Sequence, residues 1–138
     1  MLIEQKIAEQ SRMERVFRIY KDEQFVDCMH KNDECEKERV YCRHGYDHLL
    51  AVARLGYIFS LERGYGIDKE ILYATALLHD IGRWEQYLNG TPHDIAGARI
   101  ADEILLRAGF DLTEREVITA AILSHRGAGE HVGCGSLP

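Results

Sequence analysis

Apolar residues recur every three or four positions along almost the whole chain, and no stretch shows the strict alternation of a half-buried strand. This periodicity predicts an all-α fold, a compact bundle of about six helices. With 138 residues, the chain can bury a core as one domain without disulfide or metal cross-links. We therefore expect one domain, in which any bound metal serves function rather than folding.

Capping residues and glycines divide the first half of this pattern into helices. The first two are predicted over about 2–20 and 22–40, and the third over about 46–63, where Gly64 ends it. Asp68 is a suitable N-cap for the fourth helix, which ends in a His-Asp pair. The second helix is expected to bury Phe25, Val26 and Cys28, and the third Leu49, Val52, Leu55, Ile58 and Phe59.

The second half contains two further helix starts. Thr91 as N-cap with Pro92 at the first helical position predicts a fifth helix that ends near Ala108. A capping box over residues 113–116 predicts a sixth, which ends near Ser124 or His125. We divide the chain into N-terminal helices (1–42), a core that carries the candidate metal site (43–127) and an irregular tail (128–138).

Four histidines each lie near one end of the buried face of a different predicted helix. One alone would more often be a core residue bonded to the backbone than a ligand. Four, with a carboxylate beside one of them, favour a metal site, because imidazole and carboxylate together suit a divalent transition metal. The five candidate ligands are His48, His79, Asp80, His93 and His125.

Charge and composition narrow the classes of partner. Seventeen Lys and Arg stand against 23 Asp and Glu, a net charge of -6, which argues against binding to duplex nucleic acid. The net negative charge does not argue against a small phosphorylated ligand, because one or two local arginines can bind it. No apolar run reaches the length of a bilayer span, so we expect a cytoplasmic protein. The apolar first helix suggests a homo-oligomer.

The four cysteines form no C-x-x-C pair, and we expect reduced thiols. Three of them are spaced by seven residues and would share one face of an unbroken helix. The favoured interpretation is small buried hydrophobic residues, and a thiolate zinc site is the alternative. The cysteines are Cys28, Cys35, Cys42 and Cys134.

Four segments in order, "HLLAVARLG", "ALLHDIGR", "PHDIAGARIADEIL" and "AILSHRG", resemble the HD superfamily of metal-dependent phosphohydrolases. Together they cover about 43–127. A His-Asp dipeptide alone would be weak evidence. Here the pair closes an apolar helix, continues as Ile-Gly-Arg and has the other histidines in order around it.

The resemblance implies that His48, His79 and Asp80 bind a divalent metal. In members with two metals, Asp80 would bridge them, and His93 and His125 would bind the second ion. One or two ions are thus expected, and the ligand types suit manganese, iron, cobalt, nickel or zinc. The family pattern usually ends with a further Asp ligand, but no Asp follows Asp111 and only Glu130 is acidic beyond His125. We expect the last segment of the pattern to be missing; the alternative is that Glu130 or water completes the site.

The predicted activity is hydrolysis of a phosphoester in a small phosphorylated metabolite or nucleotide by a metal-activated water. Asp80 and Arg83 are the candidate catalytic residues. Arg83, Arg126 and His44 are candidate substrate contacts, since a guanidinium binds two phosphate oxygens at once; a surface ion pair is the alternative for each arginine. The competing functions are a non-catalytic ligand-binding or regulatory domain of the same fold, and a helical interaction module with histidines in its core.

Overall fold

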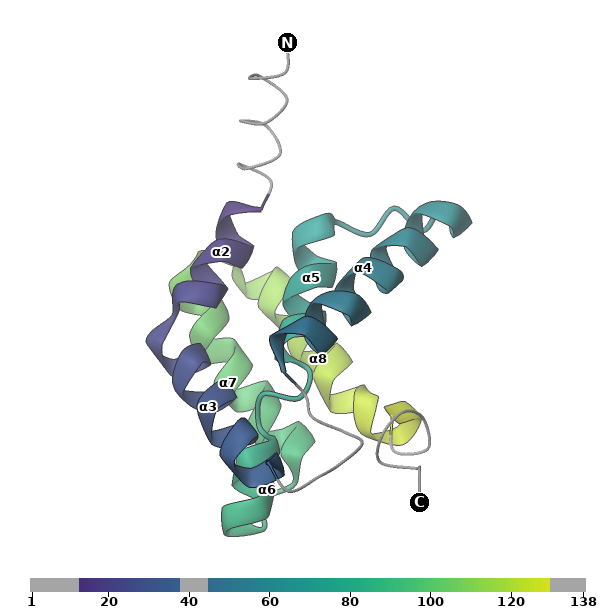
Figure 1. The fold of residues 1–138 in the computed structure, drawn as a ribbon. Coiled ribbons are helices and arrows are strands. Elements are labelled where there is room, and N and C mark those ends of the chain that lie inside the picture. The colour runs from purple at the N-terminus through teal and green to yellow at the C-terminus, as the bar shows by residue number, and fades with distance from the viewer. Residues whose placement is uncertain (1–12, 38–44, 130–138) are drawn as a thin grey trace.

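The computed structural model describes residues 13–37 and 45–129, and every regular element in these ranges is a helix. This confirms the all-α prediction. The helices, labelled as in Figure 1, are α2 (Glu14–Lys21), α3 (Glu23–Glu36), α4 (Tyr46–Arg63), α5 (Lys69–Leu78), α6 (Arg83–Asn89), α7 (His93–Ala108) and α8 (Leu112–Gly129).

Several predicted helix ends are confirmed. Asp22 accepts hydrogen bonds from two amides in the first turn of α3, and Asp68 accepts one from the first turn of α5. Gly64 and Gly109 follow α4 and α7 with φ of 68° and 100°, a conformation that other residues adopt at a cost. Local capping chemistry therefore determines where these helices begin and end.

The start of α7 differs from the prediction. Pro92, not Thr91, is the N-cap, and no side chain at this position caps the helix. Instead the amide of His93 donates to the side-chain oxygen of Gln86, at 2.9 Å. A neighbouring helix thus supplies the acceptor that Thr91 was expected to provide.

The start of α8 also differs. Asp111 is bonded reciprocally with Glu114: the Glu114 amide donates to Asp111 at 2.8 Å, and the Asp111 amide donates to Glu114 at 2.9 Å. The capping box therefore begins two residues earlier than predicted. The helix also continues past the predicted end to Gly129, and the interior Gly127, at a cost of only about 1 kcal/mol, does not end it.

The central prediction needs one further correction, and the N-terminal prediction is confirmed in part. The chain after Gly82 was expected to break the helical pattern, but it forms the short helix α6. Seven helices thus lie in the described residues, which agrees with the predicted bundle of about six. Of the predicted first helix, Glu14–Lys21 is confirmed, and residues 1–12 lie outside the described residues, so self-association through that helix stays a prediction.

The core lies between α5, α7, α8 and the N-terminal pair of helices. α7 packs against α2, α6 and α8, while α5 packs against α2, α4 and α8 (Figure 1). The two helices that carry the candidate ligands His79 and His93 are therefore central. The largest fully buried side chains are Ile19, Phe25, Leu49, Leu77, Leu78, Ile81, Ile100, Ile104, Leu105, Phe110, Ile118 and Ile122.

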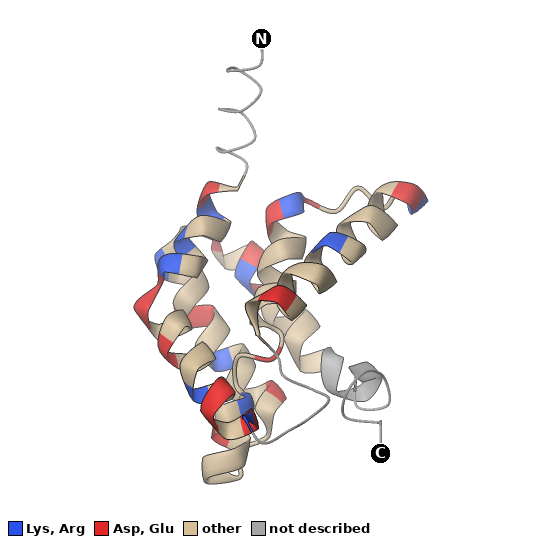
Figure 2. Cartoon of the chain, viewed as in Figure 1, with Lys and Arg blue, Asp and Glu red and all other residues tan. Residues whose placement is uncertain are grey.

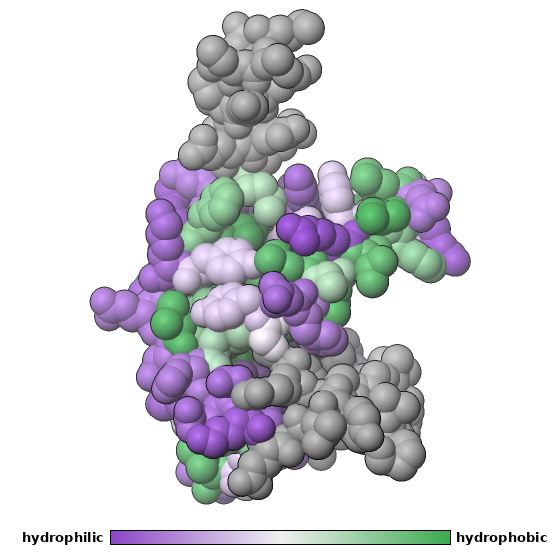
Figure 3. All heavy atoms as spheres, viewed as in Figure 1, coloured by the Kyte–Doolittle hydropathy of each residue, from purple (hydrophilic) through white to green (hydrophobic). Residues whose placement is uncertain are grey.

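Of the residues predicted to be buried on α4, only Leu49 is buried, so the predicted inner face was wrong. Its buried residues are Leu49, Ala53 and Ser60, and the position of a Cβ on Gly56 would lie 3.4 Å from Leu72 of α5. Small residues let the two helices approach closely, so the large apolar side chains point outward. Figure 3 shows apolar atoms gathered on this projecting helix. The exposed residues are Val52, Leu55, Ile58 and Phe59, with exposures of 38% to 68%.

The described surface carries charges of both signs, and the described cysteines are free thiols. Figure 2 shows acidic and basic residues interspersed along the helices drawn in colour. Among the described residues, a search for helices that could serve as membrane spans found none. Cys28 is buried as expected and Cys35 is half-buried, and both are free thiols. Val26 was predicted to be buried, but 47% of it is exposed. Cys42 and Cys134 lie outside the described residues.

Candidate functional site

His79 and Asp80 lie in the turn between α5 and α6, directly after the buried Leu77 and Leu78. The ring Nε2 of His79 is 3.1 Å from Oδ2 of Asp80, and Asp80 is only 4% exposed. Burial of a carboxylate is costly without a compensating partner. The turn therefore holds a charged group inside the molecule, next to an imidazole that can share a proton with it.

The other ring nitrogen fixes the orientation of His79. Nδ1 donates to the carbonyl oxygen of Ala76, one turn back in α5, at 2.5 Å. Burial lowers the pKa of His79, but the hydrogen bond and charge of Asp80 outweigh burial and raise it. Nε2 is therefore the nitrogen directed at Asp80, and a metal ion bound there would replace its proton.

Arg83 lies on the other side of the same carboxylate. Its Nε is 3.4 Å from Oδ1 of Asp80, and the side chain is mostly buried. Burial lowers the pKa of Arg83, but the negative charges of Asp80 and of Glu36 on α3 raise it overall. Glu36 is also buried, so a carboxylate from α3 and one from the turn both favour the charged form of this guanidinium.

Close packing against α7 brings His93 to this turn. A Cβ on Gly82 would lie 2.3 Å from the amide nitrogen of Gly97 and 2.7 Å from the carbonyl oxygen of His93. Only glycine permits this approach of two backbones. His93 is itself buried, and its Nδ1 lies 2.7 Å from the side-chain oxygen of Gln86, which leaves Nε2 as the nitrogen able to bind a metal.

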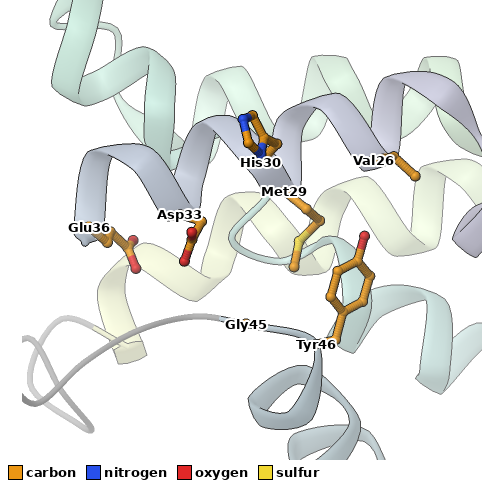
Figure 4. A pocket seen from close by; sticks show the side chains of 7 residues that line it. All are labelled: Val26, Met29, His30, Asp33, Glu36, Gly45 and Tyr46. Atoms are coloured by element: carbon orange, nitrogen blue, oxygen red, sulfur yellow. The ribbon is translucent and has the colours of Figure 1, made fainter.

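A cavity of about 320 Å³ lies between α3 and the start of α4. Glu36, which lines it, is one of the two carboxylates near Arg83. Figure 4 shows its lining side chains, which come from one face of α3 and from the first residues of α4. They are Val26, Met29, His30, Asp33, Glu36, Gly45 and Tyr46.

The structure thus brings together His79, Asp80 and Arg83, with His93 on the helix packed against them. His48 is half-buried in the first turn of α4. The remaining predicted residues are not tested: the side chains of His125 and Arg126 at the end of α8, and His44, lie outside what the structure describes.

Two residues of the site were not singled out from the sequence. Gln86 bonds both the amide and the ring of His93, and the negative charge of Glu36 raises the pKa of Arg83. No local pattern marks either, because each acts on a residue of another helix. Only the folded arrangement reveals them.

The donor types fit a divalent metal. An imidazole nitrogen and a carboxylate lie side by side, and the ring of a second imidazole is held by a hydrogen bond at Nδ1. Within the described residues, no group of three or more His, Cys, Asp or Glu side chains is arranged to hold a metal ion. The described side chains therefore match a metal in chemistry and supply part of a ligand set.

Comparison with known proteins agrees with these observations. The HD domain family matches residues 45–132. An uncharacterised protein of Clostridium beijerinckii is 42% identical over 114 residues, which cover 83% of this chain and 73% of that protein.

Two further relatives match shorter stretches. An uncharacterised protein of Methanocaldococcus jannaschii is 37% identical over 60% of this chain and 45% of its own length. A Bacillus subtilis protein named "Putative phosphohydrolase YueE" is 33% identical over 60% of this chain and 52% of its own length. No solved structure gave a significant match. The chain belongs to the HD domain family, whose members are generally metal-dependent hydrolases.

Proposed function

We propose that this chain hydrolyses a phosphoester of a small phosphorylated metabolite or nucleotide, with a divalent metal bound at the turn between α5 and α6. The observation that carries the proposal is the buried pair of His79 and Asp80, 3.1 Å apart, with Arg83 beside the same carboxylate. The name of the Bacillus subtilis relative supports phosphohydrolase activity.

The proposed ligands are Nε2 of His79 and the carboxylate of Asp80, joined by His48, His93 and His125. When bound, a divalent metal lowers the pKa of a water molecule and polarises the phosphoryl oxygens. One or two ions of manganese, iron, cobalt, nickel or zinc suit these ligands. Ala76 and Gln86 contribute by accepting from the Nδ1 atoms of His79 and His93, so that both rings present Nε2.

Arg83 is the proposed phosphate contact among the described residues. Its Nε lies 3.4 Å from the carboxylate of Asp80, and the negative charge of Glu36 further favours the charged form of the guanidinium. Planar guanidinium groups bind two phosphate oxygens at once. Arg126 and His44 are proposed as additional contacts, and Asp80 as a catalytic carboxylate that would also hold the metal.

The cavity beside Glu36 supports a substrate with a sizeable part that carries no phosphate. Its described lining contains two carboxylates, a tyrosine ring and a methionine, and no Lys or Arg. Carboxylates repel phosphate but accept hydrogen bonds from hydroxyl groups. This lining suits a sugar or nucleoside, with the phosphate directed at Arg83.

The test is a hydrolysis assay of the full chain on nucleoside monophosphates and p-nitrophenyl phosphate, with each of the five metals in turn. The proposal predicts metal-dependent phosphate release, reduced about 100-fold or more in a folded Asp80→Asn variant. Equal turnover in the parent and the variant would contradict it. Metal binding without turnover of any substrate would favour a regulatory domain instead.

A further inference from the structure

Asn32 of α3 reaches across to the turn that carries His79 and Asp80. Its side-chain nitrogen donates to the carbonyl oxygen of Asp80 at 3.1 Å, and its side-chain oxygen accepts from the amide of Trp84 at 2.9 Å. Asn32 is only 3% exposed. One buried amide therefore binds both ends of the segment from Asp80 to Trp84.

The Trp84 amide is one that α6 cannot bond within itself, because it lies in the first turn of the helix. A side chain at the N-cap usually accepts from such an amide. Here the N-cap is Gly82, which has no side chain and which the close approach to α7 restricts to glycine. Asn32 therefore caps α6 from another helix.

We infer that Asn32 is a positioning residue for metal binding, an inference that rests on the metal site proposed above. Its bond to the Asp80 carbonyl fixes the peptide plane next to the carboxylate, and its bond to Trp84 fixes the start of the helix that begins with Arg83. Together these bonds hold Asp80 between His79 and Arg83.

The arrangement requires both functions of an amide side chain. Aspartate at position 32 could still accept from Trp84 but would place a carboxylate oxygen against the carbonyl oxygen of Asp80. Alanine would leave both backbone groups without this partner. Lys31 makes a contact between the same two helices that does not involve Asp80: its ammonium lies 4.3 Å from the centre of the Trp84 ring.

The experiment titrates Co²⁺ into the metal-free full chain and follows the visible absorption spectrum, with thermal unfolding recorded for each variant. The variants are Asn32→Asp and Asn32→Ala, and Lys31→Ala is the matched control on the same pair of helices. We expect both Asn32 variants to bind Co²⁺ about 10- to 100-fold more weakly with an altered spectrum, and the control to match the parent. If Asn32→Ala does not fold, the isosteric Asn32→Asp carries the test.

The outcomes separate the two proposals. Co²⁺ affinity and spectrum equal to the parent in a folded Asn32 variant would overturn the positioning role and leave the metal site intact. A parent chain that binds no Co²⁺ would overturn the metal site, and the positioning role with it. An equal loss of affinity in Lys31→Ala would show a general effect of loosening α3 from α6, which also overturns the role assigned to Asn32.

Discussion

The turn from His79 to Arg83 and the helix α4 carry candidate ligands, yet they are held in opposite ways. Asn32 and the backbone of α7 hold the turn from two sides. By contrast, α4 packs mainly on α5 through small residues and leaves large apolar side chains such as Leu55 exposed.

The difference shows where precision is required in this molecule. The turn places a buried carboxylate, an imidazole and a guanidinium within a few ångströms of one another, and a small shift would separate them. On the described surface of α4, a side chain can change with little effect on its neighbours. Substitutions should therefore be costly in the turn and mild on the outer face of α4.

The largest effect is expected from Gly82→Ala. The new methyl group would overlap backbone atoms of α7, at 2.3 Å and 2.7 Å, which cannot move aside as a side chain can. We expect a loss of about 4 kcal/mol or more in the free energy of unfolding, measured by urea denaturation.

Gly56→Ala in α4 is the matched control. Its new methyl group would meet only the flexible side chain of Leu72, at 3.4 Å, and alanine favours the helix. The change should stay within about 1 kcal/mol of the parent. Similar losses for the two glycine variants would remove the contrast between the regions.

The second prediction compares two leucines. Leu77 is fully buried just before the turn, whereas Leu55 on α4 is 68% exposed. Leu77→Ala should cost about 3 kcal/mol in the free energy of unfolding, since it leaves a cavity. Leu55→Ala should change it by less than about 0.5 kcal/mol. A large loss for Leu55→Ala would show that its face of α4 is covered in solution.

The third prediction concerns His93 beside the turn. Gln86→Ala removes the oxygen that accepts from both the amide and the Nδ1 of His93. This loss should cost about 1 kcal/mol in the free energy of unfolding. It should also weaken Zn²⁺ binding about tenfold, because the ring loses its fixed orientation. Isothermal titration calorimetry measures this, and Gln86→Glu, which keeps an acceptor oxygen, should behave as the parent does.

The smallest effect is expected away from both regions, where Arg15 of α2 donates to Glu114 at 2.7 Å. The hydrogen bond from Arg15 lowers the pKa of Glu114. The ion pair therefore contributes fully to stability at a pH above 4.5, the ordinary pKa of the carboxyl group, and this contribution is lost as the pH falls through the lowered pKa of the folded protein. Glu114→Gln keeps the capping box and should cost about 0.5 kcal/mol at pH 7. Chemical denaturation should show this difference closing below about pH 4; a constant difference would contradict the assignment.

Local signals in the sequence predicted much of the fold. Asp22, Asp68, Gly64 and Gly109 act within their own helix ends, and so the prediction of these ends is confirmed. The prediction of the inner face of α4 was wrong, because hydrophobicity alone does not show that two helices meet through small residues. Packing against another helix, rather than local pattern, decided that face.

The same distinction applies to the candidate site. The His79-Asp80 pair was visible in the sequence because it closes an apolar helix, and the HD domain family is confirmed. Asn32 and Gln86 were not visible, because they act on backbone or ring atoms of other helices. The participation of His48 and His125 in the ligand set stays a prediction.

The most direct test of the account is the metal content of the purified full chain after incubation with each candidate metal, measured by elemental mass spectrometry. The double variant His79→Ala, Asp80→Ala is measured alongside, with circular dichroism to show that it folds. The account predicts about one or two equivalents of metal in the parent and their loss in the folded variant. No metal in the parent, or the same content in both proteins, would contradict the central claim that this turn is a metal site.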